Sequence, residues 1–204
     1  MIDIAAHINA TRRDVTRDEE SVSVIMGRTY DAAVDDVWEA LTDPDRIKRW
    51  LMPISGDLRV GGTFQLEGNA GGEILECEPP ARYKVTFGDA TSVIEVRLTA
   101  TGDERTDLVL EHTVPLAMAQ SGAGAFTVGP GWDGALLGLA LFLTGEVKEG
   151  DDPVEAANSE EAQRYSLASV LAWETAITAS GTATPEEVAA GKEMSMGFFA
   201  PGVD

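Results

Sequence analysis

The sequence predicts an α+β fold with an antiparallel sheet of six to seven strands, one long helix after the sheet, and a helical C-terminal extension. Two observations support this prediction. Apolar residues recur with a period of two between residues 54 and 114, in short runs separated by turn-forming Gly, Pro and Asp residues. From Gly131 onward the apolar period becomes that of a helix, and it stays helical in two later segments.

The segment before the sheet predicts an N-terminal arm followed by one strand. Residues 1–20 are polar and show no apolar period, so we expect a loose arm or a short helix there. Residues 21–30 (SVSVIMGRTY) alternate, with Val22, Val24 and Met26 on one face, which is typical of a strand with one buried side.

Two short helices are predicted over residues 34–50 (VDDVWEALTDPDRIKRW). Trp38 lies on the apolar side of the first helix and is expected in the core. Asp43 can cap the second helix, and Pro44 suits its first position, where a missing N–H breaks no helical hydrogen bond.

The strands between residues 54 and 114 form a predicted meander whose buried face follows from parity. Turn-forming pairs such as Gly61-Gly62 and Pro79-Pro80 separate the runs, so consecutive strands are expected to pair antiparallel. The expected inward positions are Phe64 and Leu66; Glu73, Leu75 and Cys77; Tyr83, Val85 and Phe87; Ile94, Val96 and Leu98; and Leu108, Leu110, His112 and Val114.

The segment GWDGALLGLALFLTG (131–145) predicts a buried helix. Trp132, Leu136 and Leu139 share one face of this helix. Gly134 and Gly138 lie nearly opposite and form a shallow groove where a downstream helix could approach closely. Capping boxes and a closing glycine predict two such helices. These helices are expected over residues 158–181 and 184–199. The chain is thus expected to divide into an arm over 1–20, a domain over 21–146, and an extension over 147–204 that packs on that domain.

Composition excludes several classes of partner. The net charge of −20 would repel nucleic-acid phosphates and anionic lipid, so neither nucleic acid nor a membrane surface is expected as a partner. The longest nearly apolar run, 135–143, is far shorter than the about 20 residues of a membrane span. One cysteine, Cys77, cannot form an internal disulfide, which favours a cytoplasmic location.

The order of elements and three motifs resemble a known family. RTYDAAVDDVWEALTDPDRIKRWL (28–51), DLRVGGTF (57–64) and GGEILECEPPARYKVTF (71–87) are similar to the signatures of bacterial AHSA-type domains (activator of heat-shock-protein ATPase) in the START-like, polyketide-cyclase-like (SRPBCC) superfamily. The resemblance covers about residues 22–145. The sequence departs from the family pattern at Val34, where proline is common, and after His112.

This resemblance implies a helix-grip fold, in which a curved sheet wraps around a long C-terminal helix, often with an apolar cavity between them. It says little about activity, because one scaffold hosts many functions. The implied cavity leads us to expect that residues between sheet and helix form a wall that binds a small hydrophobic molecule. The alternative is that the same residues are simply core. The residues of this expected wall are Trp50, Phe64, Leu66, Tyr83, Phe87, His112, Trp132, Leu136 and Leu139.

Three polar residues lie an even number of positions from the apolar residues of their strand and are therefore expected on its apolar face: Arg28, Glu73 and His112. A charged or polar group there must be paired or must lie beside a hydrated cavity. They could orient a ligand, and Glu73 with His112 could act as acid and base in an enzyme. The alternatives are a buried Arg28–Glu73 ion pair with a structural histidine, or a strand register misread by one residue.

Other chemistries find no support in the sequence. With two histidines and no paired His/Cys spacing, no metal site is expected, and no cofactor is expected because nucleotide-binding fingerprints are missing.

Three functions remain: a module that binds a hydrophobic ligand, a cyclase- or hydrolase-like enzyme, and a domain that regulates a chaperone ATPase. We rank the chaperone partner lower, because bacterial members with this extension lack the cochaperone's other domain. Apolar residues near 194–199 (MSMGFF) also suggest a homodimer.

Overall fold

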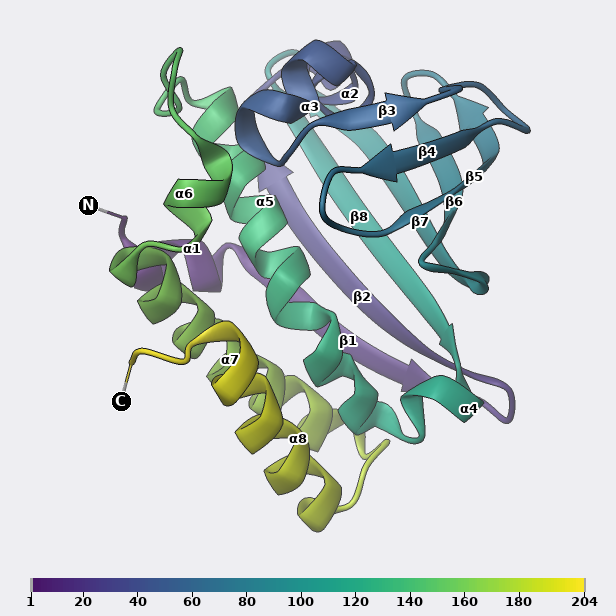
Figure 1. Ribbon diagram of the computed structural model, residues 1–204, viewed down its shortest axis with the longest axis vertical. Helices are drawn as coiled ribbons and strands as arrows, with labels where there is room; N and C mark the ends of the chain where they lie inside the picture. Colours follow the sequence, from purple (N-terminus) through teal and green to yellow (C-terminus); the bar gives the residue numbers. More distant parts are fainter. Residues whose placement is uncertain (1, 204) are drawn as a thin grey trace. The chain divides into compact units, whose positions relative to one another are not determined.

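The computed structural model describes residues 2–203 and confirms the predicted α+β fold (Figure 1). Within these residues the chain forms an eight-stranded sheet with the order β1-β2-β8-β7-β6-β5-β4-β3. The strands are β1 Thr11–Arg17, β2 Ser21–Tyr30, β3 Ile54–Gly56, β4 Thr63–Leu66, β5 Gly71–Glu78, β6 Arg82–Phe87, β7 Asp89–Gly102 and β8 Arg105–Pro115. The helices are α1 Ile4–Asn9, α2 Val34–Thr42, α3 Pro44–Trp50, α4 Leu116–Ala119, the 3₁₀ helix η1 Gly122–Thr127, α5 Gly129–Leu143, α6 Pro153–Ala157, α7 Glu160–Ser180 and α8 Pro185–Phe199.

Local sequence signals placed most of these elements correctly. The chain breaks between α2 and α3 at Asp43, whose side chain accepts a hydrogen bond from Asp45 N, with Pro44 at the first helical turn. Strands β3 to β8 are neighbours in chain order, as the meander required. Helix α8 has the predicted capping box of Thr184 and Glu187. The cap of α7 is Ser159, whose side chain accepts a hydrogen bond from Ala162 N.

The segment expected to be a loose arm or a short helix contains the short helix α1 and also a strand, β1, which was not expected. Thr11 and Val15 of β1 are buried, and the position between them with the same parity is Arg13. A charged residue at an inward position hides the period of two, so the sequence pattern did not reveal this strand.

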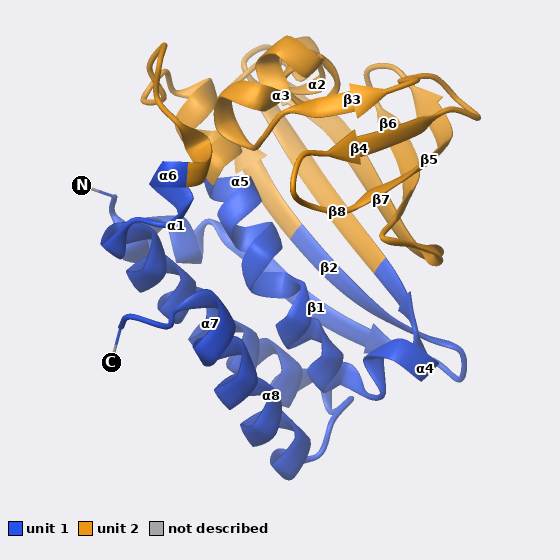
Figure 2. Ribbon diagram, in the orientation of Figure 1, with its two compact units in different colours: residues 1–26, 113–137, 155–204 blue, residues 27–112, 138–154 orange. Residues whose placement is uncertain are grey.

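The chain divides into two compact units, which Figure 2 shows in different colours. Unit 1 combines the chain up to Met26 with Thr113–Leu137 and the chain from Glu155 onward. Unit 2 combines Gly27–His112 with Gly138–Val154.

In unit 1, helices α7 and α8 lie side by side, and α7 also runs along β1 (Figure 1). The first half of α5 meets α7 at Gly129, where an added Cβ would lie 2.4 Å from Trp173 Cε2. Gly134, expected to be part of the groove for the extension, has no atom within 4 Å of an added Cβ. The extension therefore approaches α5 at Gly129, which is neither of the two glycines predicted to form the groove.

In unit 2, the second half of α5 meets the end of α3. A Cβ added to Gly138 would lie 2.8 Å from the carbonyl oxygen of Trp50, so the close approach expected at this glycine comes from α3. The indole of Trp50 donates from Nε1 to Ala40 O at 3.0 Å, which ties α3 to α2. Of the described residues, none belongs to a helix long and apolar enough to cross a membrane.

Candidate functional site

The sheet of unit 2 has a charged outer face and an apolar inner face. On the outer face, Arg97 bonds Glu95 at 2.6 Å and Glu111 at 2.9 Å, which pairs neighbouring strands through charge. The inner positions alternate with these residues and are buried on both long strands. They are Ser92, Ile94, Val96 and Leu98 on β7, and Thr106, Leu108, Leu110 and His112 on β8.

On β5 and β6 the same inner face is apolar but only half-buried. The register pairs Val85 with Ile94 and Tyr83 with Val96, which places these β6 side chains on the inner face. Ile74 of β5 pairs with Val85 and continues that face. Ile74, Tyr83, Val85 and Phe87 all keep partial exposure, in contrast to the buried inner residues of β7 and β8. We call these four residues the β5–β6 strip. It is a partly accessible apolar surface.

Aromatic contacts define the two ends of the β5–β6 strip. At one end the Tyr83 ring meets the ring of Trp38, from α2, edge-on at a centroid distance of 6.1 Å. Burial, with a smaller effect of the nearby Cys77 thiol, raises the pKa of the Tyr83 hydroxyl, which therefore stays a neutral hydrogen-bonding group. At the other end the Phe87 ring meets the His112 ring edge-on at 5.9 Å.

His112 forms a buried polar pair with Ser92. Ser92 Oγ lies 2.8 Å from His112 Nε2, and the two residues are 4% and 2% exposed. Burial lowers the pKa of His112 to about 4, so the ring is neutral near pH 7. A neutral imidazole has one donor and one acceptor nitrogen, and it can therefore take part in directional hydrogen bonding without adding charge to an apolar face.

The other two predicted polar residues lie elsewhere. Arg28 is buried, with its guanidinium carbon 5.6 Å from the centre of the Tyr30 ring. The hydroxyl of the next residue, Thr29, donates to Asp107 at 2.5 Å, so Arg28 lies beside the Leu108 part of β8. That is four residues, or about 13 Å, from His112 along the strand. The structure therefore does not bring Arg28 to the polar pair.

The inward orientation predicted for Glu73 is wrong. Glu73 is exposed and pairs with Thr63, while the neighbouring pair Phe64–Gly72 faces the other way. A register shift between Ile74 and Glu76 interrupts the alternation of side chains between the two faces of β5. The inward positions inferred from the end of this strand therefore do not apply at its start. The strand order separates β5 from β2 by four strand spacings, about 19 Å, which rules out an Arg28–Glu73 ion pair.

The remaining predicted wall residues divide between core and surface. Trp50, Phe64, Leu66 and Leu139 are buried in unit 2, which agrees with the alternative that they are core. Leu136 is buried and Trp132 is half-exposed, and both belong to unit 1. Sequence reasoning missed Ile74, Val85 and Ser92 as site residues. Ser92 has the same parity as Ile94 and Val96, so its pattern could have identified it.

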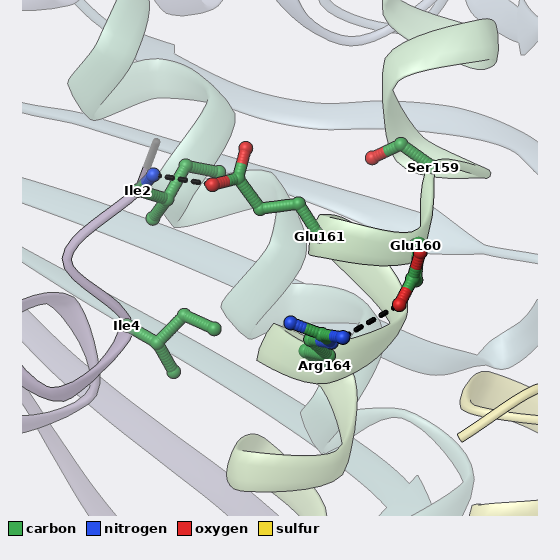
Figure 3. A pocket seen from close by; sticks show the side chains of 6 residues that line it. All are labelled: Ile2, Ile4, Ser159, Glu160, Glu161 and Arg164. Atoms are coloured by element: carbon green, nitrogen blue, oxygen red, sulfur yellow. Dashed lines mark hydrogen bonds and ion pairs between the residues drawn. The ribbon is translucent and has the colours of Figure 1, made fainter.

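Unit 1 has an open recess of about 490 Å³ at the start of α7 (Figure 3). Ile2 and Ile4 form one side of it, and Ile2 N donates to Glu161 Oε1 at 2.6 Å. Arg164 in the recess is already paired with Glu160 at 2.6 Å. None of the predicted site residues lines this recess, so we place the candidate site on the inner face of unit 2.

Comparison with known proteins identifies the class of this fold. The eight-stranded antiparallel sheet and the long helix after it correspond to the helix-grip fold of START-like domains. The sequence matches the family described as activator of Hsp90 ATPase homolog 1-like protein over residues 31–143. The chain belongs to this family. A search of curated proteins gave no match.

Several solved structures are similar to this chain. The crystal structure of CalU16 from Micromonospora echinospora is 40% identical over 82% of this chain and 98% of its own, with a TM-score of 0.68, and the solution structure of CalU16 gives 0.70. MLL2253 from Mesorhizobium loti is 25% identical over 60% of this chain and 97% of its own, with a TM-score of 0.53. DynU16, a protein in the dynemicin biosynthetic locus, is 26% identical over 61% of this chain and 48% of its own, also with 0.53.

Proposed function

We propose that this protein binds a small hydrophobic molecule on the inner face of unit 2, over the β5–β6 strip. The observation that supports this most is the half-exposure of Ile74, Tyr83, Val85 and Phe87 on a face whose other strands are buried. Apolar side chains with a few placed polar groups are the usual lining of a small-molecule site.

The aromatic rings in this surface favour an aromatic ligand. Tyr83 and Phe87 offer ring edges and faces, and aromatic pairs contribute about 0.5–1.5 kcal/mol beyond the area they bury. The similarity to DynU16, from a biosynthetic locus, is consistent with a polyketide-like aromatic ligand. A cytoplasmic location fits such a role. The exposed position of Glu73 removes half of the proposed acid/base pair, so binding is favoured over catalysis.

Replacing Val85 by tryptophan is expected to block ligand binding. The larger side chain would fill the partly accessible space between Ile74 and Tyr83, so affinity should fall at least tenfold. Native mass spectrometry and a thermal-shift screen of lipids and polyketide-like aromatics on the natural chain would first identify a ligand. Titration of both variants with that ligand then measures the effect.

Lys84→Trp is the matched control for this experiment. Lys84 is the adjacent residue of β6 and points to the outer face, where its Nζ lies 4.0 Å from Glu95. This variant introduces the same tryptophan side chain on the opposite face and should bind like the natural chain. Equal affinity of V85W and K84W, or no binding of any hydrophobic compound to the natural chain, would contradict the proposed function.

We also propose that α8 forms the contact of a homodimer. Met194 and Phe198 lie one helical turn apart and are 54% and 75% exposed. Burying such side chains against a second copy removes apolar surface from water. Sedimentation velocity at about 100 µM should show a dimer that F198E converts to a monomer. L171E, at an exposed leucine of α7, is the control and should leave the dimer intact. A monomeric natural chain would refute this contact.

A further inference from the structure

The polar pair at the Phe87 end indicates which ligands the site would select. We propose that Ser92 is the residue that hydrogen-bonds the ligand, that His112 positions its hydroxyl group, and that the pair selects neutral aromatic molecules carrying a hydroxyl or carbonyl group. This inference rests on the proposed function, because it assigns the polar end of the same apolar surface.

Ser92 keeps hydrogen-bonding capacity after its bond to His112. A serine hydroxyl has one donor and two acceptor positions. If Ser92 donates to His112 Nε2, its lone pairs can accept from a ligand hydroxyl. If it accepts from an Nε2–H, its own proton can be donated to a ligand carbonyl or hydroxyl oxygen. In both directions the 2.8 Å bond restricts how the hydroxyl can rotate, and this restriction is the positioning role of His112.

The local backbone leaves Ser92 without a residue directly opposite it on β6. The β6–β7 register pairs Thr86 with Val93 and then jumps to Phe87 with Asp89, so the residues from 90 to 92 fall outside the paired stretch. The side chain of Asp89 stabilises this irregularity by accepting from Thr91 N at 2.8 Å and from Thr91 Oγ1 at 2.5 Å. Ser92 is therefore next to an opening in the ladder, a place where bulges often direct side chains toward a site.

Phe87 is the residue of the β5–β6 strip whose ring contacts this pair. Its ring contacts His112 at 5.9 Å and remains half-exposed. A ligand packed on Tyr83 and Val85 would reach Ser92 by replacing or displacing part of the Phe87 ring. Only the end of the ligand that passes Phe87 would meet a polar group.

The inner face at this end would reject an anionic ligand. On the described lengths of β7 and β8, the inner positions are Ser92, Ile94, Val96, Leu98, Thr106, Leu108, Leu110 and His112. None of these residues carries a positive charge near pH 7, since burial keeps the His112 ring neutral. Arg28 is about 13 Å away along the sheet. A carboxylate buried here would lose its hydration without gaining a charged partner.

A matched set of naphthalenes tests this inference on the full chain. Naphthalene, 2-naphthol, 2-acetonaphthone and 2-naphthoate share one ring system and differ in the terminal group. Dissociation constants for the natural chain, Ser92→Ala and Ser92→Thr can be measured by NMR titration. One hydrogen bond contributes about 0.5–1.5 kcal/mol, which is roughly a twofold to tenfold change in affinity. The natural chain should bind 2-naphthol and 2-acetonaphthone tighter than naphthalene by that factor, and 2-naphthoate weakest.

The variants separate a ligand contact from a structural role. S92A should lose the preference for the hydroxyl and carbonyl compounds over naphthalene. S92T keeps the hydroxyl and should restore that preference. Addition of 2-naphthol should shift the ¹⁵N resonance of His112 Nε2 in the natural chain and not in S92A. The inference is overturned if S92A keeps the preference, or if 2-naphthoate binds best. If the natural chain binds none of the four, the proposed aromatic site itself fails.

Discussion

Replacing Asp133 by alanine is expected to lower the free energy of unfolding by about 3–5 kcal/mol. Asp133 is fully buried at the start of α5. Its carboxylate accepts from Arg13 Nη2 at 2.7 Å and Nε at 2.8 Å, from Ser169 Oγ at 2.5 Å and from Trp173 Nε1 at 2.9 Å. Truncation would leave the arginine buried without its counter-ion and two further donors unsatisfied.

All the groups in this cluster belong to unit 1, so the effect can be assigned to that unit. For a chain of this size, each kcal/mol corresponds to a shift in Tm of about 2–4 °C, so D133A should melt roughly 6–20 °C lower. Thermal and urea unfolding both measure this loss. The control is Asp45→Ala, which removes an exposed ion pair with Lys48 on α3 and should leave the stability close to that of the natural chain.

A double replacement distinguishes a buried ion pair from a simple packing defect. In Arg13→Met with Asp133→Leu, no charge remains in the cluster, and apolar groups of similar size fill its place. Such exchanges are often neutral or even stabilising. We therefore expect the double variant to be more stable than D133A alone. If D133A is as stable as the natural chain, or if removing Arg13 as well makes D133A still less stable, this account of the cluster is wrong.

Acidification from pH 7 to pH 4 is expected to destabilise the fold by about 3 kcal/mol through His112 alone. The pKa of His112 in the folded chain is lowered by burial to about 4, from an ordinary value of 6.5. Between these two values the unfolded chain binds a proton at this residue and the folded chain does not. Stability therefore rises with pH across this window and is lost as the pH falls through it.

Urea unfolding at several pH values between 4 and 7 measures this dependence. His112→Gln retains a polar side chain but cannot titrate, so its stability should change much less between pH 6.5 and 4.5. The carboxyl groups whose pKa values are lowered, such as Asp45 and Glu187, are unchanged in this variant and act at lower pH. The same slope in H112Q and the natural chain would contradict the assignment to His112.

Local signals in the sequence were sufficient for most elements of this fold. Caps at Asp43 and Thr184 placed helix starts, because a capping side chain acts on backbone only two or three residues away. The period of two on β7 and β8 correctly gave the inner face, including His112, because these long strands alternate without interruption over their buried positions.

The errors arose where a distant residue or a bulge overrides the local pattern. Strand β1 was missed because Arg13 occupies an inward position, and only Asp133, 120 residues later, makes that position tolerable. Glu73 was assigned to the wrong face because the register shift beside Ile74 changes parity inside one strand. The open part of the inner face on β5 and β6 could not be predicted either, because exposure depends on what the rest of the fold leaves uncovered.

The buried cluster of Asp133, Arg13, Ser169 and Trp173 also constrains which terminal segments a member of this family can lose or gain during evolution. The family match spans residues 31–143 and includes Asp133, but Arg13 precedes this span and Ser169 and Trp173 follow it. A protein reduced to the shared segment would retain an acidic group that had lost its neutralising arginine on one side and two uncharged hydrogen-bond donors on the other. We therefore expect the two flanking segments to be inherited together with this aspartate, and relatives that lack both to have an uncharged residue in its place.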